Sequence, residues 1–204
     1  MELIERREYL DWLIRWREKD VIKVVSGVRR CGKSTMFDIY QDYLRKNGVE
    51  ARQIVAINFE DMEFEHLTDY RRLYEYVKPL ILTDRMTYVF LDEIQYVVDF
   101  ERAVDSLFIK PNVDLYITGS NAYFMSGELA TLLSGRYVEL RMLPLSFSEF
   151  AAGFRDCDAS DAQCFGSYLT LGSFPYTARS GQSEREAREY LRDIYNTVLL
   201  KDIV

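Results

Sequence analysis

The chain has 204 residues, 48% of them hydrophobic and 29% charged, with a net charge of −7. These proportions are typical of a globular protein, and the length suits one domain with part of a second. The longest apolar runs are too short to span a bilayer, and the charged N-terminus excludes a signal peptide. We therefore expect a cytoplasmic protein with no membrane segment. The acidic balance argues against a nucleic-acid clamp, although it leaves a local basic patch open.

Cysteine and histidine are scarce. The three cysteines are Cys31, Cys157 and Cys164, none of them in a C-x-x-C pair, and His66 is the sole histidine. This pattern argues against a zinc site and fits the reduced thiols of a cytosolic protein.

The first elements in the chain are predicted to be a helix, a strand and a second helix. Apolar residues recur on one face of residues 2–18, which predicts a helix. A β-branched run from Val21 to Val25 predicts a strand. An amphipathic pattern after residue 34 predicts a helix that ends at Asn47-Gly48.

The stretch between this strand and the second helix fits G-x-x-x-x-G-K-[ST], the phosphate-binding loop. Glycines let the backbone turn so that successive N–H groups point at an anion, and the helix dipole adds positive charge. Lys33 is expected to reach the β- and γ-phosphates, and the Ser34 hydroxyl to ligate Mg²⁺. The alternative is a glycine-rich turn between core elements. The predicted nucleotide-binding residues are Gly27, Val28, Arg29, Arg30, Cys31, Gly32, Lys33, Ser34 and Thr35.

Two acids form the second candidate site. A buried strand is predicted over 52–59, then an acidic loop and a helix near 68–82, before the segment TYVFLDEIQ at 87–95. Four apolar residues there lead into Asp92 and Glu93, so both carboxylates are expected at the carboxyl edge of a sheet, where ligands bind. Asp92 is predicted to hold Mg²⁺, and Glu93 to act as the general base for the attacking water. The alternative is a strand followed by solvated acids.

A helix near 99–109 and an apolar strand at 113–121 follow. The tip of this strand would bring Thr118, Ser120 or Asn121 near a γ-phosphate. The equal alternative is that these residues cap the next helix. A short helix is then predicted, and Arg136 stands directly before a further strand, followed by a helix over 145–154.

The C-terminal part is predicted to be a polar loop at 155–164, a turn at 172–175 and a helix at 183–200. The sequence stops at 204 without a cap or polar tail, from which we expect the N-terminal piece of a longer protein. The domain prediction is a core at 1–154 and a helical C-terminal extension at 155–204, the start of a truncated further region.

Several motifs together resemble a known family. They are GVRRCGKST, INFED, VFLDEIQ, ITGSNA, LLSGR, LPLSFSEF and GSFP, in this order. The chain resembles, from about residue 4 to its end, prokaryotic ATP-binding proteins of the AAA superfamily that pair an N-terminal ATPase domain with a C-terminal domain of unknown function. The resemblance implies an α/β, three-layer P-loop NTPase of the additional-strand type. Its central parallel sheet, flanked by helices, would place strand 113–118 between the phosphate-loop strand and the acid strand.

The resemblance also assigns roles. It supports Lys33, Ser34, Asp92 and Glu93 as above, and Asn58 matches a polar residue that holds the catalytic glutamate away from water. Arg136 matches the place of an arginine finger, and this would make the protein a homo-oligomer if it acts in trans. The competing interpretations are a cis contact and an ion pair with Glu128 or Glu139. No lid domain or lid arginine is recognisable, so we expect an incomplete adenine pocket and slow hydrolysis.

Three functions remain as hypotheses. The first is an ATPase that uses Mg²⁺ and drives a conformational change of a C-terminal domain or partner. The second is a nucleotide-gated switch with little turnover, DNA-associated or related to defence or toxins. The third, a scaffold or nucleic-acid-binding module with a vestigial loop, is opposed by the intact motifs. Separately, the position of Cys31 at a helix N-terminus beside cations predicts either a reactive thiol with a lowered pKa or only a tolerated small residue.

Overall fold

The centre of the molecule is a parallel β-sheet. The computed structural model of the protein describes residues 4–120, 133, 135–153, 160–178 and 183–202. Within them lies a five-stranded sheet of order β2-β3-β4-β1-β5, in which every neighbouring pair is parallel. The strands are β1 (Ile22–Gly27), β2 (Ile54–Asn58), β3 (Thr87–Asp92), β4 (Val113–Ser120) and β5 (Tyr137–Met142). Because β4 lies between β1 and β3, the predicted additional-strand order is confirmed.

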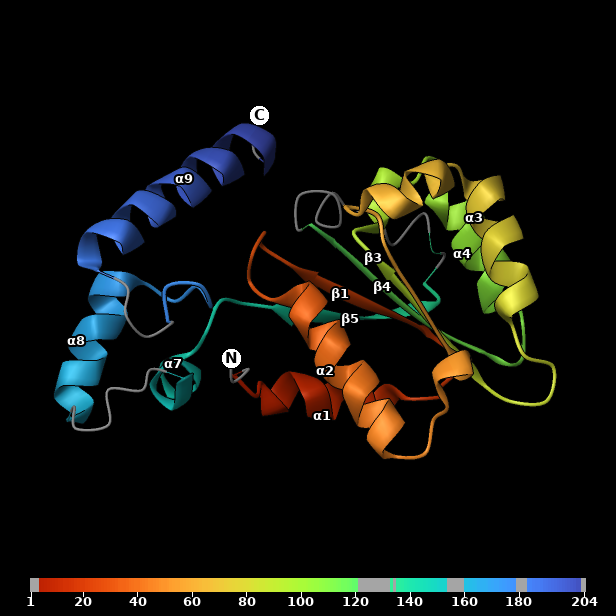
Figure 1. Cartoon of the computed structure of the whole chain (residues 1–204), viewed down its shortest axis with the longest axis horizontal. Coiled ribbons are helices and arrows are strands. Elements are labelled where there is room, and N and C mark those ends of the chain that lie inside the picture. Colours follow the sequence, from red (N-terminus) through yellow and green to blue (C-terminus); the bar gives the residue numbers. More distant parts are fainter. Residues whose placement is uncertain (1–3, 121–132, 134, 154–159, 179–182, 203–204) are drawn as a thin grey trace.

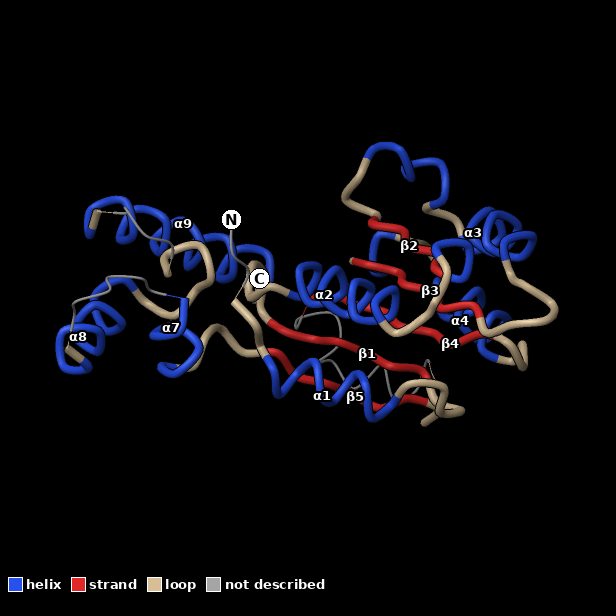
Figure 2. Tube along the Cα trace, turned by 60° about the horizontal axis from the view of Figure 1, so that its bottom comes forward, coloured by secondary structure: helices blue, strands red, loops and turns tan. Residues whose placement is uncertain are grey.

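Helices cover both faces of the sheet (Figures 1 and 2). Helices α1 and α2 pack on one face, and α3 and α4 pack on the other. The three-layer prediction is therefore confirmed. The α-helices are α1 (Arg7–Trp16), α2 (Lys33–Lys46), α3 (Tyr70–Val77), α4 (Phe100–Phe108), α7 (Phe147–Gly153), α8 (Asp161–Leu171) and α9 (Glu184–Asp202). The 3₁₀ helices are η1 (Ala51–Gln53), η2 (Met62–Leu67), η3 (Lys78–Leu80) and η4 (Ile94–Tyr96). No helix of the described residues has both the length and the apolar character to cross a membrane.

The central strands are mostly apolar because both of their faces are buried. Successive residues of β1 point to opposite sides, so Val24 joins the core under α3 and α4 while Val25 joins the core under α1 and α2. In β3 the same alternation separates Val89 from Phe90. Continuous apolar runs of this kind are expected in parallel sheets covered by helices on both sides.

One charged residue interrupts the run in β1. Lys23 is fully buried, and its Nζ donates hydrogen bonds to Asp114 Oδ1 at 2.5 Å and to the carbonyl of Lys19 at 2.6 Å. Burial lowers the pKa of the Lys23 ammonium, although Asp114 opposes that shift. The carboxylate of Asp114 also accepts from the N–H of Glu18. This ion pair therefore ties β1 and β4 to the turn that follows α1.

Helices α7, α8 and α9 stand beyond the sheet and form a core of their own (Figure 1). The prediction of a loop over the whole of 155–164 is wrong at its end, because α8 begins at Asp161. The polar residues there cap the helix: the Ser160 hydroxyl accepts from the N–H of Gln163, and the Gln163 side chain accepts from the N–H of Ser160. This is a capping box, in which polar residues start a helix rather than extend a loop.

The end of β1 is packed too closely for any residue but glycine. A Cβ at Gly27 would lie 2.5 Å from the carbonyl oxygen of Met142 on β5 and 2.8 Å from Cys31 Sγ. The backbone of the phosphate loop thus leaves β1 pressed against the neighbouring strand. Gly166, inside α8, has no atom within 4 Å of the corresponding position.

We expect Gly27→Ala to lower the free energy of unfolding by about 1–3 kcal/mol, the usual cost of overpacking. The matched control Gly166→Ala should be neutral or stabilising, because alanine is the better helix former. Thermal and urea unfolding of both variants measure the difference. Equal stability of the two variants would contradict the packing argument.

Candidate active site

The phosphate loop connects β1 to α2, and its backbone adopts the conformation that an anion site needs. Gly32, which immediately precedes α2, has a φ of 101°, and Arg30 has a φ of 64°. No side chain caps the start of α2. Its first N–H groups are therefore available to bind an anion, at the positive end of the helix dipole.

Asp92, the last residue of β3, is buried and held by two hydroxyl groups. Thr118 of β4 donates a hydrogen bond to the Asp92 carboxylate, and Ser34 of α2 is hydrogen-bonded to the same carboxylate. Burial raises the pKa of the Asp92 carboxyl, although these hydrogen bonds oppose the shift. A cation at this position would offset the cost of burying the charge. The Ser34 and Asp92 oxygens are ligands of the kind that Mg²⁺ prefers, so the residues present fit the predicted metal.

Glu93 follows directly and lies over the phosphate loop. Its backbone has a φ of 57°, and its N–H donates to the Thr118 hydroxyl at 2.9 Å. The carboxylate is 3.3 Å from Lys33 Nζ through Oε1, and Oε2 accepts from Gln95 Nε2 at 2.5 Å. Lys33 and Glu93 are 4% and 7% exposed. The predicted base and the predicted phosphate-binding lysine are thus in contact.

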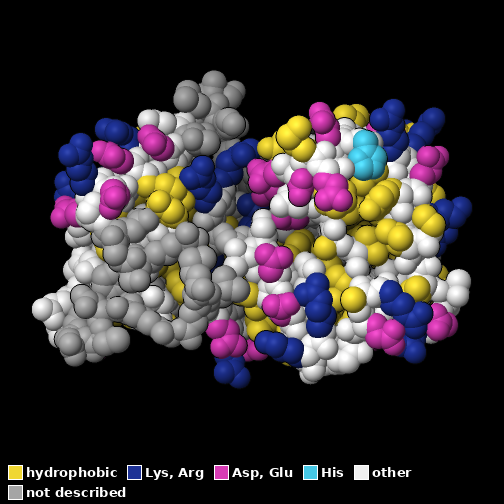
Figure 3. Space-filling model, viewed as in Figure 1, with side chains coloured by type: hydrophobic (Ala, Val, Ile, Leu, Met, Phe, Trp, Pro, Cys, Tyr) yellow, Lys and Arg dark blue, Asp and Glu magenta, His cyan; other side chains and the backbone are white. Residues whose placement is uncertain are grey.

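A cavity of about 630 Å³ opens beside these residues. Its volume lies in the range of small-molecule sites. Figure 3 shows a hollow between the C-terminal helices and the sheet, with basic side chains gathered on one border and acidic ones on the other. The lining residues come from three places in the chain: the phosphate loop and α2 (Arg29, Arg30, Gly32, Lys33, Ser34, Thr35), the acidic loops (Glu60, Glu93) and the C-terminal region (Pro175, Tyr176, Tyr190, Asp193, Ile194).

The C-terminal region closes one side of this cavity with aromatic rings. The ring centroids of Tyr176 and Tyr190 are 4.3 Å apart, and the Arg30 guanidinium lies 5.5 Å from the centroid of Tyr190. Pro175 approaches the loop so that a Cβ at Gly32 would lie 3.8 Å from it. The 172–175 turn and α9 thus border the cavity on this side, and the expected incomplete adenine pocket with slow hydrolysis remains a prediction.

A family model described as "AAA domain" matches residues 19–151. The chain belongs to this family. An uncharacterised protein of Haemophilus influenzae is 37% identical over 205 residues, which cover 98% of this chain and 50% of the relative. One of Methanocaldococcus jannaschii is 28% identical over 194 residues, 90% of this chain and 42% of the relative. The chain thus spans about half the length of the relatives it matches.

Solved structures show the same fold at low sequence identity. A Walker-type ATPase of Pyrococcus abyssi superposes with a TM-score of 0.63 at 17% identity, covering 98% of this chain and 75% of that one. Cdc6p of Pyrobaculum aerophilum gives a TM-score of 0.54 at 15% identity, with coverages of 97% and 63%. The AAA domain described here therefore has the fold of P-loop ATPases.

Val28 and Ser120 lie at the start of the phosphate loop. Val28 packs against the core under α1 and α2, and its carbonyl accepts from the N–H of Cys31 at 3.3 Å. Ser120 pairs with Gly27 in the β4–β1 register, which puts the tip of β4 beside the start of the phosphate loop. The side chain of Ser120, together with Asn121, lies outside the described residues.

Asn58 is at the predicted edge of the sheet, opposite Asp92 in the β2–β3 register. Its side chain accepts a hydrogen bond from the N–H of Glu60 at 2.9 Å. In this conformation Glu93 is instead held by Lys33, Gln95 and Thr118. The predicted restraint of Glu93 by Asn58 remains a prediction.

Arg136 lies at the N-terminal end of the parallel strands, whereas the phosphate loop lies at their C-terminal end. Its carbonyl accepts from the N–H of Ile22, the first residue of β1, whereas the phosphate loop follows the last. At roughly 3.3 Å per residue, the two ends of β1 are about 16 Å apart. The alternative of a cis contact with nucleotide therefore does not fit this geometry.

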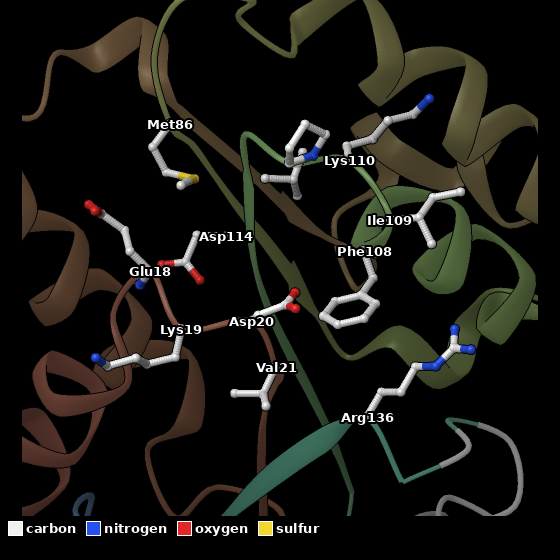
Figure 4. A pocket seen from close by; sticks show the side chains of 12 residues that line it. Glu18, Lys19, Asp20, Val21, Met86, Phe108, Ile109, Lys110, Asp114 and Arg136 are labelled. Carbon is white, nitrogen blue, oxygen red and sulfur yellow. Dashed lines mark hydrogen bonds between the residues drawn. The ribbon is translucent and has the colours of Figure 1, made fainter.

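The side chain of Arg136 borders a separate cavity of about 570 Å³, with Ile109 and Asp20 among the other lining residues (Figure 4). The Arg136 side chain is half exposed, and its Nη1 lies 3.9 Å from Oδ1 of Asp105 in α4. Glu139, one of the predicted partners, instead accepts from Ser26 and Arg141, and Glu128 lies outside the described residues. A role for Arg136 towards a neighbouring subunit remains a prediction.

Sequence reasoning missed Gln95 and the aromatic pair of Tyr176 and Tyr190. Gln95 stands in the VFLDEIQ motif, two residues after Glu93, and Tyr176 directly follows GSFP. Proximity to these motifs was the available signal. Tyr190 gave none, because its helical spacing is that of an ordinary core residue.

Of the two alternatives for Cys31, the structure supports the tolerated small residue and contradicts the reactive thiol with a lowered pKa. The side chain is fully buried, and burial raises the pKa of the Cys31 thiol although Lys33 and Arg6 oppose the shift. Arg6 contacts the Cys31 carbonyl at 3.0 Å and also bonds to Glu149 at 3.0 Å. Desolvation of the thiolate outweighs the nearby cations and the helix dipole.

We expect iodoacetamide to alkylate Cys31 slowly in the native protein, with or without nucleotide, because the thiol is both buried and protonated. Peptide mass spectrometry measures the rate. The same reaction in denaturant is the control and should be fast. Rapid native labelling that nucleotide suppresses would contradict the burial of Cys31.

Proposed function

We propose that this AAA domain binds ATP and hydrolyses it with Mg²⁺, driving a conformational change of a C-terminal domain or partner. The observation that carries the proposal is the convergence of Lys33, Ser34, Asp92 and Glu93 beside a cavity of nucleotide size. They come from the start of α2, the end of β3 and the turn that follows β3, and each has the chemistry that its proposed role needs.

In the nucleotide complex, the phosphates and the adenine base would occupy different parts of the cavity. The N–H groups at the start of α2 and the ammonium of Lys33 would take the β- and γ-phosphates. Ser34 and Asp92 would hold Mg²⁺, which when bound neutralises charge on those phosphates. Pro175 and the ring of Tyr176, which is 40% exposed, offer the adenine base an apolar surface.

Glu93 would then accept a proton from the attacking water. The water oxygen forms a bond to the γ-phosphorus while the bond from that phosphorus to the β,γ-bridging oxygen breaks. ADP leaves with the electron pair, and Lys33 stabilises the charge that develops there. The ion pair between Lys33 and Glu93 supports this role, because the γ-phosphate would lie on the same side of the loop as the Glu93 carboxylate.

A nucleotide-gated switch with little turnover is the second candidate. The contact of Arg30 with Tyr190 supports it, because a phosphate-loop residue touches α9 directly. Nucleotide that draws Arg30 inward would change this contact whether or not hydrolysis follows. The turnover rate distinguishes the two candidates, since a switch stays bound and hydrolyses very slowly.

The remaining proposals concern context. We retain the division into a core at 1–154 and a helical extension at 155–204, and a cytoplasmic location, where ATP is available. Assembly with a second copy of the chain through Arg136 is also proposed, supported by its exposed position far from its own phosphate loop.

Glu93→Gln should reduce ATP turnover by roughly 10²–10⁴-fold, the usual contribution of general base catalysis, while ATP binding survives. Lys33→Ala should weaken binding itself. Phosphate release and equilibrium binding of a fluorescent ATP analogue measure the two effects. Wild-type turnover by Glu93→Gln would refute the role of Glu93 as base.

A mixture of Arg136→Ala and Lys33→Ala subunits should recover activity that each lacks alone. Some interfaces would then pair an intact Arg136 with an intact Lys33, and a finger in trans is worth ~10³–10⁵ in rate. Arg102→Ala, an exposed arginine on α4, is the control and should keep activity. No recovery in mixtures proven to co-assemble would rule out the trans role.

A further inference from the structure

The two oxygens of the Glu93 carboxylate have different partners. Oε1 faces Lys33 Nζ at 3.3 Å, and Oε2 accepts from Gln95 Nε2 at 2.5 Å. Gln95 lies in η4, which begins directly after Glu93. One oxygen is therefore directed at the phosphate loop while the other is held from within its own segment.

The orientation of the Gln95 amide follows from chemistry. An ionised carboxylate only accepts hydrogen bonds, so the NH₂ group must face Glu93 and the carbonyl must point elsewhere. That carbonyl oxygen, Oε1, is buried and has no hydrogen-bond partner among the described residues. The Gln95 amide thus uses its donor group, whereas its acceptor is left unsatisfied.

The backbone of Glu93 is fixed as well. Its left-handed conformation is uncommon for a residue with a side chain, and the Thr118 hydroxyl holds its N–H. With the backbone and Oε2 both restrained, the remaining freedom of the side chain is small. Only the contact of Oε1 depends on Lys33.

We propose that Gln95 is a positioning residue that keeps Glu93 directed at the attacking water once nucleotide has taken Lys33. This rests on the proposed function. Phosphates attract Lys33 and break its ion pair with Glu93, so Oε1 becomes free to accept a proton. Gln95 retains Oε2 and prevents the carboxylate from following the lysine towards the phosphates. Gln95 itself does not touch the nucleotide.

The inference predicts that Gln95→Met, which keeps the length of the side chain and removes the donor, lowers kcat. The expected loss is roughly 10–100-fold, the range for residues that support a ligand in metal sites. KM and the dissociation constant for ATP should stay within about twofold, since only an interaction used in the chemical step is lost. Gln95→Glu, which replaces the donor by a second carboxylate, should lower kcat similarly.

Gln53→Met is the matched control. Gln53 is a buried glutamine that, like Gln95, donates a hydrogen bond, here to the carbonyl of Met86, but it lies at the end of the sheet opposite to the phosphate loop. It should leave kcat unchanged. Thermal unfolding of all variants shows that the comparison is made between folded proteins.

A double-mutant cycle separates a positioning role from a structural one. In a Glu93→Gln background, Gln95→Met should have no further effect on residual turnover, because Gln95 acts through the Glu93 carboxylate. An additive loss would overturn the inference, and so would an unchanged kcat or a loss of affinity that matches the fall in kcat. Absence of wild-type turnover would instead overturn the proposed function, so the two failures are distinguishable.

Discussion

The hydroxyl of Thr118 bonds to two acidic residues of the neighbouring strand end, donating to Asp92 and accepting from the N–H of Glu93. This cross-strand contact exists because β4 lies beside β3 in a parallel sheet. In a parallel sheet the C-terminal ends of all strands lie on the same side, and the order of the strands decides which of these ends are neighbours. The candidate site depends on that order, since the acids, the hydroxyl and the phosphate loop come from three separate strands.

The site carries buried charges that are only partly compensated. Lys33 and Glu93 neutralise each other, but burial still raises the pKa of Asp92. Such an arrangement favours a ligand that brings both anionic and cationic groups, as ATP with Mg²⁺ would. In the proposed function, binding would exchange the Lys33–Glu93 pair for contacts with phosphate, and the hydrogen bond from Gln95 would then restrain the Glu93 carboxylate.

The phosphate loop is tied to the C-terminal region on two sides. Arg30 lies against Tyr190 of α9, and Arg6 joins the Cys31 carbonyl to Glu149 of α7. The loop is therefore in contact with helices that are far from it in sequence. The polar residues around the start of α8 have the composition of a loop, but Ser160 and Gln163 form a capping box, so the helix begins earlier than composition predicts.

Local patterns alone determined the sheet elements, the phosphate loop and the positions of Lys33, Ser34, Asp92 and Glu93, because each depends on spacing within a few residues. Burial and strand neighbours were decided only by the tertiary structure. The sequence does not show that Lys23 pairs with Asp114, that desolvation outweighs the cations near Cys31, or that Arg136 lies an entire strand away from the loop. Those outcomes depend on which distant segments pack together, and desolvation and long-range contacts leave no trace in local spacing.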